Sequence, residues 1–513
     1  MKTIYIILLC VFFSTLGFSQ KNSQYKKELK AANLAYEKAD YLNAFNYFSD
    51  LIKKDTSDAE LWFKAGASLF NMNKMDTSST YYFEKSKTKI PEAHYYLGKT
   101  YQLQGQTRKA LDELYHFKSV NKEESIENSE VDKVIRACES NIKEEANKES
   151  FIVRNLGSGI NSKYPEYVPL VWNVNGSLIF TSRRADSKGG LKDPYGRYYE
   201  DIYVAQKTST GWSKPGPIGD DINTQTHDAC VAMSPSGNEL IIYRTDEKQT
   251  GGDFYLCQFD GTKWSLPQKM GPEINSEYLE ASACFSSDGT EIVFSSNRPG
   301  GFGGKDLYRI RKFMNGKYSL PFNLGPDINT NEDEDAPFVD KDNTLYFSSK
   351  GHNSIGEYDI FKSAFDAENL KWLEAKTLGV PINSPNDDIY FMKIEDSQKA
   401  LFTSRREGGF GDADLYQIDF EESSQVIVYC KLNTVIEKSE LKDLVMSCYD
   451  AETGQLEGIY RPNKNYMSMI LVMTKDKPYK MILEGNMIEP VIKRMTFATG
   501  DTEISLEVSK RIK

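Results

Sequence analysis

The chain has 513 residues, of which 39% are hydrophobic and 27% are charged, and its formal net charge is −11 at pH 7. This length exceeds what one hydrophobic core supports, so about two to four domains are expected. The acidic balance argues against nucleic acid as the main partner, because nucleic-acid binding depends on phosphate neutralisation by lysine and arginine.

Residues 1–19 are predicted to be a secretory signal peptide. Lys2 precedes an apolar run from Ile4 to Phe13, and the small residues Gly17 and Ser19 follow it. A transmembrane helix needs about 20 apolar residues, and no later run reaches that length. Cys10 lies inside the apolar run, so lipid attachment is not expected. The mature chain is therefore expected to be exported, and either soluble or peripheral to a membrane.

Residues 20–147 are predicted to form a tetratricopeptide helical domain. The small residues Ala32, Gly66 and Gly98 recur near the tetratricopeptide period, and residues 128–147 have the apolar spacing of a capping helix. The concave face of such an array projects inner-helix residues toward a partner peptide. By repeat offset, the candidate protein-binding groove consists of Asn33, Tyr36, Phe63, Phe70, Tyr95, Lys99 and Gln102. The alternative is that several of these residues belong to the core.

Residues 151–420 are predicted to form a five-bladed β-propeller. Apolar residues follow a period of two, and one block of four strands repeats five times. Each block carries an Ile-Asn pair shortly after a glycine, and the asparagines are Asn161, Asn223, Asn275, Asn329 and Asn383. The last block ends after three strands, near Phe420. The segment 151–157, which precedes the first block, is therefore expected to complete the fifth blade.

The first strand of each block begins with a carboxylate. These acids are Glu166, Asp228, Glu280, Asp335 and Asp388. Five acids in register would surround one mouth of the propeller channel, where they would hold a cation or a basic peptide. The alternative is that each acid caps a turn of its own blade, and the fivefold recurrence favours this alternative. The aspartate of an Asp-x-aromatic motif that opens each third strand is interpreted as architectural for the same reason.

Residues 424–513 are predicted to form a small β-sandwich, because about seven short β-rich runs follow the repeats. Cys430 and Cys448 fall on expected strands of this segment. An oxidising compartment would permit a disulfide between them. The alternative is that both are buried thiols.

The order of these segments resembles that of Bacteroidetes envelope proteins typified by PorE, a periplasmic component of the type IX secretion system. The residues that carry the resemblance are the Gly-x-x-Ile-Asn repeats and the glycine segment Gly300–Gly304, partly repeated at Gly408–Gly411. The resemblance implies tetratricopeptide repeats, a WD40-like (TolB-type) propeller and a carboxypeptidase-regulatory-like sandwich. It also implies a scaffold in the periplasm or at the periplasmic face of the outer membrane, which binds envelope proteins or peptides. Family members usually continue into an OmpA-like peptidoglycan-binding domain. This chain ends at Lys513, so the resemblance does not imply anchoring to the cell wall.

Catalysis is not expected from these residues. The chain has four histidines, and it contains neither the HExxH nor the GxSxG motif, so no catalytic residue, metal site or cofactor is predicted. The alternative function is a glycan-binding or glycan-processing propeller, because five-bladed rings also house glycosidases with paired carboxylates. Such a pair would be inequivalent, whereas the acids of this chain repeat from blade to blade.

Overall fold

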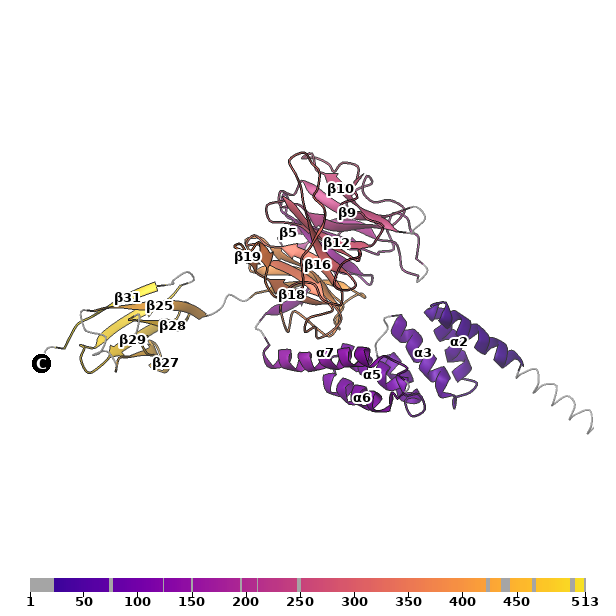
Figure 1. The fold of residues 1–513 in the computed structure, drawn as a ribbon, viewed down its shortest axis with the longest axis horizontal. Helices are drawn as coiled ribbons and strands as arrows, with labels where there is room; N and C mark the ends of the chain where they lie inside the picture. The colour runs from indigo at the N-terminus through magenta and orange to yellow at the C-terminus, as the bar shows by residue number, and fades with distance from the viewer. Residues whose placement is uncertain are drawn as a thin grey trace, which may run out of the picture. The chain divides into compact units, whose positions relative to one another are not determined.

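A computed structural model of the chain describes residues 23–72, 77–122, 124–148, 151–193, 196–209, 211–246, 251–420, 425–434, 443–463, 467–498 and 503–511 (Figure 1). The predicted signal peptide, residues 1–19, lies outside these ranges. Within them, every helix is too short or too polar to span a bilayer. The chain divides into two compact units, Met1–Phe420 and Glu421–Lys513.

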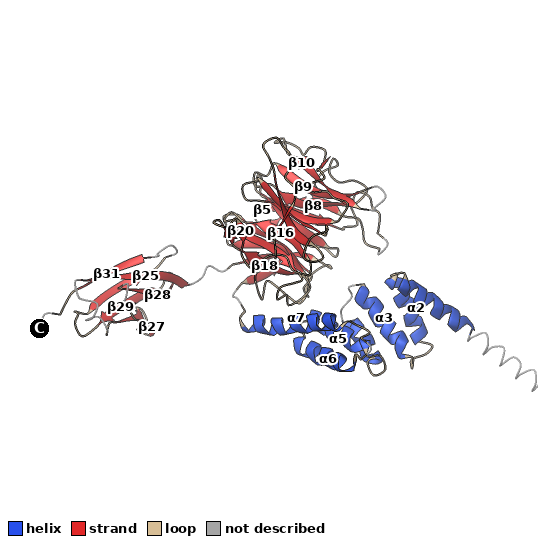
Figure 2. Ribbon diagram, viewed as in Figure 1, coloured by secondary structure: helices blue, strands red, loops and turns tan. Residues whose placement is uncertain are grey.

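The first unit begins with a helical segment, drawn in blue in Figure 2. Residues 23–37 are helical. They are followed by α2 (Tyr41–Ile52), α3 (Ala59–Asn71), α4 (Thr77–Ser86), α5 (Glu92–Leu103), α6 (Thr107–Val120) and α7 (Asn128–Ala146). Consecutive helices pack closely, and a Cβ at Gly98 would lie only 2.5 Å from Leu114 Cγ. The expected helical segment is thus confirmed, and glycine is required where α5 meets α6.

Five four-stranded antiparallel sheets, here numbered 1 to 5, follow the helices. Sheet 1 contains β2 (Glu166–Trp172), β3 (Ser177–Ser182), β4 (Asp201–Ala205) and β7 (Gly216–Pro217). Sheet 2 contains β8 (Asp228–Met233), β9 (Glu239–Thr245), β10 (Gly252–Gln258) and β11 (Gln268–Lys269). Sheet 3 contains β12 (Glu280–Phe285), β13 (Glu291–Ser296), β14 (Asp306–Arg311) and β15 (Phe322–Asn323).

Sheet 4 contains β16 (Glu334–Val339), β17 (Leu345–Ser349), β18 (Asp359–Ser363) and β21 (Lys376–Thr377). Sheet 5 contains β22 (Asp388–Ile394), β23 (Lys399–Ser404), β24 (Asp414–Asp419) and β1 (Ile152–Asn155). Two small hairpins accompany them, β5 (Lys207–Thr208) with β6 (Gly211–Trp212) and β19 (Phe365–Asp366) with β20 (Lys371–Trp372).

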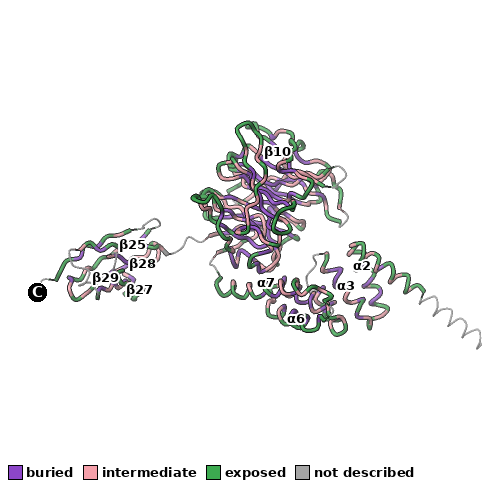
Figure 3. Tube along the Cα trace, in the orientation of Figure 1, coloured by how far each residue is buried: buried purple, intermediate pink, exposed green. Residues whose placement is uncertain are grey.

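Sheet 5 is completed by the strand that precedes sheet 1 in the sequence. Strand β1 pairs with β24 in a register that runs from Ile152 opposite Asp419 to Asn155 opposite Tyr416. The expected pairing of this segment is confirmed. The first strands of the five sheets also contact one another in a closed cycle, β2–β8–β12–β16–β22–β2. Buried residues, purple in Figure 3, follow these strands, and the connecting loops are mostly exposed.

The asparagine of each Ile-Asn pair joins two neighbouring sheets. Asn161 accepts a hydrogen bond from Leu415 N and donates one to Leu415 O, both at 2.9 Å. The same two-bond pattern recurs between Asn223 and Ile202, Asn275 and Phe254, Asn329 and Leu307, and Asn383 and Ile360. Each amide therefore pairs with the third strand of the preceding sheet as a short piece of backbone would.

The second unit consists of two sheets that share one apolar core. One sheet has the order β28 (Ser468–Thr474), β25 (Gln425–Thr434), β31 (Glu503–Val508). The other has the order β27 (Leu456–Tyr460), β26 (Val445–Asp450), β29 (Pro478–Glu484), β30 (Val491–Thr496). Cys430 and Cys448 both lie in the shared core as free, buried thiols. The alternative of two buried thiols is therefore the one found in the structure, and no disulfide joins Cys430 and Cys448.

The contact of Asn161 with Leu415 joins the first and last sheets of the ring, and it can be compared with the contact of Asn275 with Phe254, which joins two sheets that are consecutive in the sequence. Asn161→Ala leaves the N–H of Leu415 without a partner, while its C=O still accepts a hydrogen bond from Leu156 N. We expect the substitution to lower the free energy of unfolding of the first unit by about 2 kcal/mol. Asn275→Ala is the matched control and should cost the same. Urea unfolding followed by tryptophan fluorescence measures both values. A cost near zero at Asn161 beside a full cost at Asn275 would contradict the closure.

Candidate functional site

The acids that open the first strands are buried and hydrogen-bonded within their own sheets. Glu166 accepts hydrogen bonds from Ser162 N at 2.8 Å, Ser162 Oγ at 2.7 Å and Ser182 Oγ at 2.8 Å. Arg184 Nε lies 3.1 Å from the same carboxylate. Asp228, Glu280 and Asp388 have the same kind of neighbours, with Arg244, Arg298 and Arg406 as their cations. These acids cap turns of their own sheets.

In sheet 4 the equivalent acid is Glu334, and the prediction of Asp335 is wrong. Glu334 pairs in register with Ser349 and accepts hydrogen bonds from Thr330 N at 2.8 Å and Thr330 Oγ1 at 2.7 Å. Asp335 instead accepts a hydrogen bond from Ser282 in sheet 3 and forms an ion pair with Lys305. A shift of one residue along a strand reverses the face on which a side chain lies, so only one of these adjacent acids can occupy the repeated position.

Glu334 differs from the other repeated acids in having no cation. Among the described residues, no arginine or lysine forms an ion pair with it, because Gly351 stands where sheet 1 has Arg184. A Cβ at Gly351 would lie 2.1 Å from Thr330 Oγ1. Burial raises the pKa of Glu334 to about 7, although hydrogen bonds from Thr330 and Ser349 act in the opposite direction.

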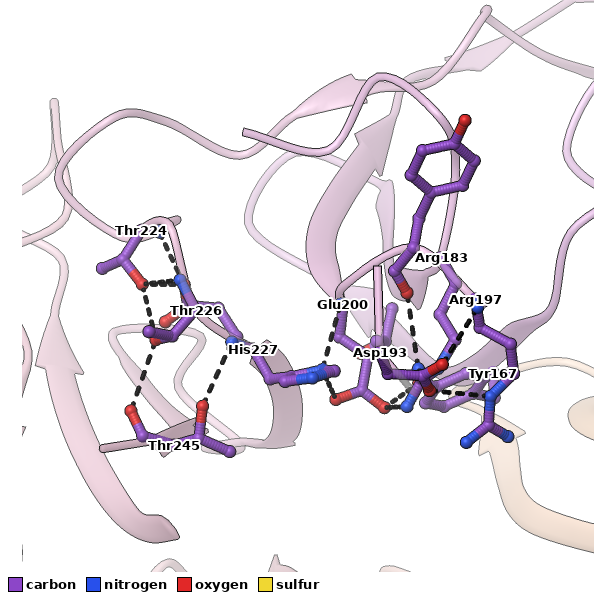
Figure 4. Close-up of polar contacts among 12 residues, drawn as sticks. Tyr167, Arg183, Asp193, Arg197, Glu200, Thr224, Thr226, His227 and Thr245 are labelled. Carbon is purple, nitrogen blue, oxygen red and sulfur yellow. Dashed lines mark hydrogen bonds and ion pairs between the residues drawn. The ribbon is translucent and has the colours of Figure 1, made fainter. Parts of the chain in front are cut away.

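Sheets 1 and 2 carry a polar cluster centred on Glu200 (Figure 4). Glu200 accepts hydrogen bonds from Tyr167 Oη and from Arg183 at 2.7 Å, and His227 Nδ1 lies 2.9 Å from its other oxygen. Arg183 also contacts Asp193 at 3.2 Å, in the loop between β3 and β4. Burial alone would raise the pKa of Glu200, but His227 and Arg183 outweigh it and hold the pKa at about 2.

A second inequivalent cluster surrounds Asp335 in sheets 3 and 4. Its partner Lys305 lies 5.3 Å from the ring centre of Tyr358, and Lys350 lies 4.7 Å from the same ring. Tyr358 Oη donates to Asp333 at 3.1 Å. Cationic, anionic and aromatic groups thus alternate at this end of the sheets.

Sequence reasoning missed both clusters because it compared only the residues that repeat. The signal lies one residue before the Asp-x-aromatic aspartate. Successive sheets have Glu200, Gly252, Lys305, Tyr358 and Ala413 at that position. Five different residue types at one equivalent position indicate that it is not required for the architecture.

The first strands also enclose a cavity of about 110 Å³. All five sheets contribute to its lining, which is mainly apolar and includes Leu170, Met233, Phe285, Phe338 and Met392. The polar residues Asn173, Ser287, Lys341 and Glu395 also line it. The cavity is therefore an apolar space along the cycle of first strands.

The structure divides the predicted helical groove into two sets of residues. Tyr95 and Gln102 are each only 6% exposed, so they are not part of an open groove. Gln102 Nε2 donates to Ile355 O at 3.3 Å, and Lys99 lies 3.7 Å from Glu357. Gln102 and Lys99 therefore contact the loop before β18 in sheet 4, whereas Tyr95 is buried in the core that the helices share and donates a hydrogen bond to Glu130.

The remaining predicted residues are only partly buried. Asn33 accepts a hydrogen bond from Lys64 at 2.9 Å. Phe63 and Phe70 both pack against Tyr96, with ring centres 5.5 and 5.2 Å apart, and Tyr36 packs against Phe48. A partly exposed aromatic surface remains on the N-terminal half of the helical segment.

Comparisons with known proteins give no family. No family model and no curated protein matches the chain. Among solved structures, a putative TolB from Agrobacterium tumefaciens is 14% identical over 63% of this chain and 97% of that chain, with a TM-score of 0.31. An endo-arabinase from Bacteroides thetaiotaomicron is 13% identical over 54% and 99%, with a TM-score of 0.34. The Yersinia enterocolitica type III secretion translocator chaperone SycD is 17% identical over 23% and 85%, with a TM-score of 0.22. At these TM-scores the similarities do not assign the chain to a family.

The missing cation at Glu334 predicts a pH-dependent stability. Between pH 4.5 and about 7 the unfolded carboxyl ionises while the folded one keeps its proton, so stability falls as the pH rises through this window. Glu334→Gln removes this loss. We expect the variant to gain on the order of 2 kcal/mol relative to the parent chain between about pH 5 and pH 8.

Chemical denaturation at a series of pH values measures this difference. His352 lies in the same sheet, and burial lowers its pKa, which makes stability rise with pH. Repeating the series with His352→Gln in both chains separates the two effects. A difference between parent and variant that does not change with pH would refute the assignment to Glu334.

Proposed function

We propose that this chain is a non-enzymatic, exported scaffold that binds other proteins in the bacterial envelope. The observation that carries the proposal is the fivefold use of one carboxylate position. Glu166, Asp228, Glu280, Glu334 and Asp388 each accept hydrogen bonds from the serine or threonine four residues earlier. Their oxygens are thereby used to hold loops in place, which is an architectural role and favours binding over reactivity.

In this proposal the five sheets are the blades of a WD40-like (TolB-type) propeller. The closed cycle of first strands and the pairing of β1 with β24 support it, because closing the ring through the N-terminal strand leaves no blade incomplete. The helical segment is proposed to be a tetratricopeptide array, and the second unit a carboxypeptidase-regulatory-like sandwich.

The order of segments and the repeat motifs support a relationship to the PorE-like envelope proteins of Bacteroidetes. On that basis the chain would act in type IX secretion or in envelope assembly, in the periplasm or at the periplasmic face of the outer membrane. The partner would be an envelope protein or peptide held by the aromatic surface of Tyr36, Phe63 and Phe70.

Mutation of the aromatic surface tests the proposal. The mature chain is used to isolate a partner from envelope extracts, and the purified partner is then titrated by calorimetry. We expect Phe70→Ala to weaken binding at least about tenfold, because aromatic anchors dominate interface energies. Tyr47→Ala, at a residue that is 44% exposed on α2, is the control and should bind as the parent does. Equal affinities of the two variants for the partner would contradict binding at the aromatic surface.

A glycan-processing function is the second candidate, and the two inequivalent clusters favour it. Glu200 and Asp335 come from different sheets, each beside a cation and an aromatic ring, and paired inequivalent carboxylates are what glycosidases use. The pKa of about 2 at Glu200 argues against its donating a proton at neutral pH.

A panel of glycosides distinguishes the two candidates. The scaffold proposal expects no turnover by the parent chain. Turnover that is lost in Glu200→Gln or Asp335→Asn, but retained in Asp228→Asn, would replace the scaffold with an enzyme.

A further inference from the structure

Three of the five sheets carry the same short loop before the third strand. In each loop the backbone N–H of an apolar residue donates to the aspartate four positions later, from Phe302 to Asp306, Ile355 to Asp359 and Phe410 to Asp414. The aspartate is the first residue of the Asp-x-aromatic motif. Because a buried carboxylate holds each loop, the apolar residue occupies an equivalent place at the same end of its sheet.

Each of these loops is also held against the next sheet. A Cβ at Gly303 would lie 2.3 Å from Glu332 O, and one at Gly411 would lie 2.5 Å from Tyr164 O. A Cβ at Gly356 would lie 2.5 Å from Pro385 C. The backbones therefore approach closely at all three loops, and only glycine permits this distance. The loops are anchored on both sides before any partner binds.

The three apolar residues differ in exposure. Phe302 is 51% exposed and Phe410 is 50% exposed, whereas Ile355 is 1% exposed. The helical segment lies at the Ile355 loop, where Gln102 of α5 donates to Ile355 O and Asn386 donates to Leu103 O at 2.9 Å. The buried loop is thus the one that meets helix α5.

The two exposed loops lie in the sheets on either side of the buried one. Sheets 3 and 5 both contact sheet 4 through their first strands, β12 with β16 and β22 with β16. Phe302 and Phe410 therefore flank the contact between Ile355 and α5. Half-exposed phenylalanines on anchored loops contribute little to the core, and they match the rigid aromatic anchors that dominate protein interfaces.

We propose that Phe302 and Phe410 form a docking pair for an α-helical surface of a partner protein. The chain itself indicates this kind of partner, because the loop of sheet 4 that is held by the same hydrogen bond to an aspartate contacts a helix, α5, within the same unit. The pair extends that interface to both sides. It is separate from the aromatic surface at Phe63 and Phe70 on α3, so it stands or fails independently of the groove.

Photocrosslinking in the full mature chain tests the proposal. Benzoylphenylalanine replaces Phe302, Phe410 or, as the control, Phe313, which is 47% exposed at the opposite end of β14. We expect positions 302 and 410 to crosslink to one partner in envelope extracts, with the crosslinked residues mapped by mass spectrometry to an α-helical segment. Crosslinks to an extended segment, to lipid or to a second copy of this chain would overturn the proposal. Equal crosslinking from position 313, or none from 302 and 410, would also overturn it.

Titration of the purified partner completes the test. The double variant Phe302→Ser, Phe410→Ser should bind it at least about tenfold more weakly, while Phe313→Ser should bind it as the parent does. Both variants should keep the parent melting temperature, because the substituted side chains are half exposed. Phe70→Ala, measured with the same partner, separates this surface from the groove. An unchanged affinity of the double variant would contradict the docking pair even if the groove variant fails to bind.

Discussion

The five-sheet body depends on one repeated interaction, the pairing of an asparagine amide with the backbone of the preceding sheet. An amide side chain has a donor and an acceptor arranged like those of a peptide group, so it can extend a strand sideways by one residue. The five amides are between 1% and 7% exposed. At that depth an unpaired amide is costly. A sheet that shifted from its position would leave the amide unpaired, so the contact fixes the position of each sheet. Asn161 differs only in linking residues far apart in the sequence.

Positions required for this ring are repeated, and positions beside them are free to differ. The carboxylates at the starts of the first strands hold their own loops, and in sheets 3, 4 and 5 the aspartates of the third strands hold theirs. One residue before those aspartates, sheet 1 has Glu200 and sheet 3 has Lys305. The clusters around Glu200 and Asp335 and the ends of the loops are therefore the places where the sheets are not equivalent.

Much of the fold could be predicted from the sequence because local patterns and the repeat determine it. The pairing of β1 with β24 followed from a block that lacked one strand. The site was harder to predict. Glu334 and Asp335 are adjacent acids, and only the register with Ser349 distinguishes them. Repeat offsets placed Tyr95 and Gln102 on a concave face. They carry no information about the core between the helices, which buries Tyr95, or about sheet 4, which contacts Gln102.

Sheet 4 departs from the repeat at the place where it contacts the helices. Its loop has Gly351 instead of an arginine and Ile355 instead of a phenylalanine, and the close approach of Gly351 to Thr330 excludes a larger side chain. The loop that meets α5 therefore lacks the cation that neutralises the acid in the other sheets, and burial holds the pKa of Glu334 at about 7. Each of the other four sheets has an arginine that pairs with the acid, and two of them present phenylalanine on loops held by the same hydrogen bond to an aspartate. The loop between β17 and β18 thus contains both departures from the repeat, Gly351 where the arginine is missing and Ile355 where α5 makes its contact.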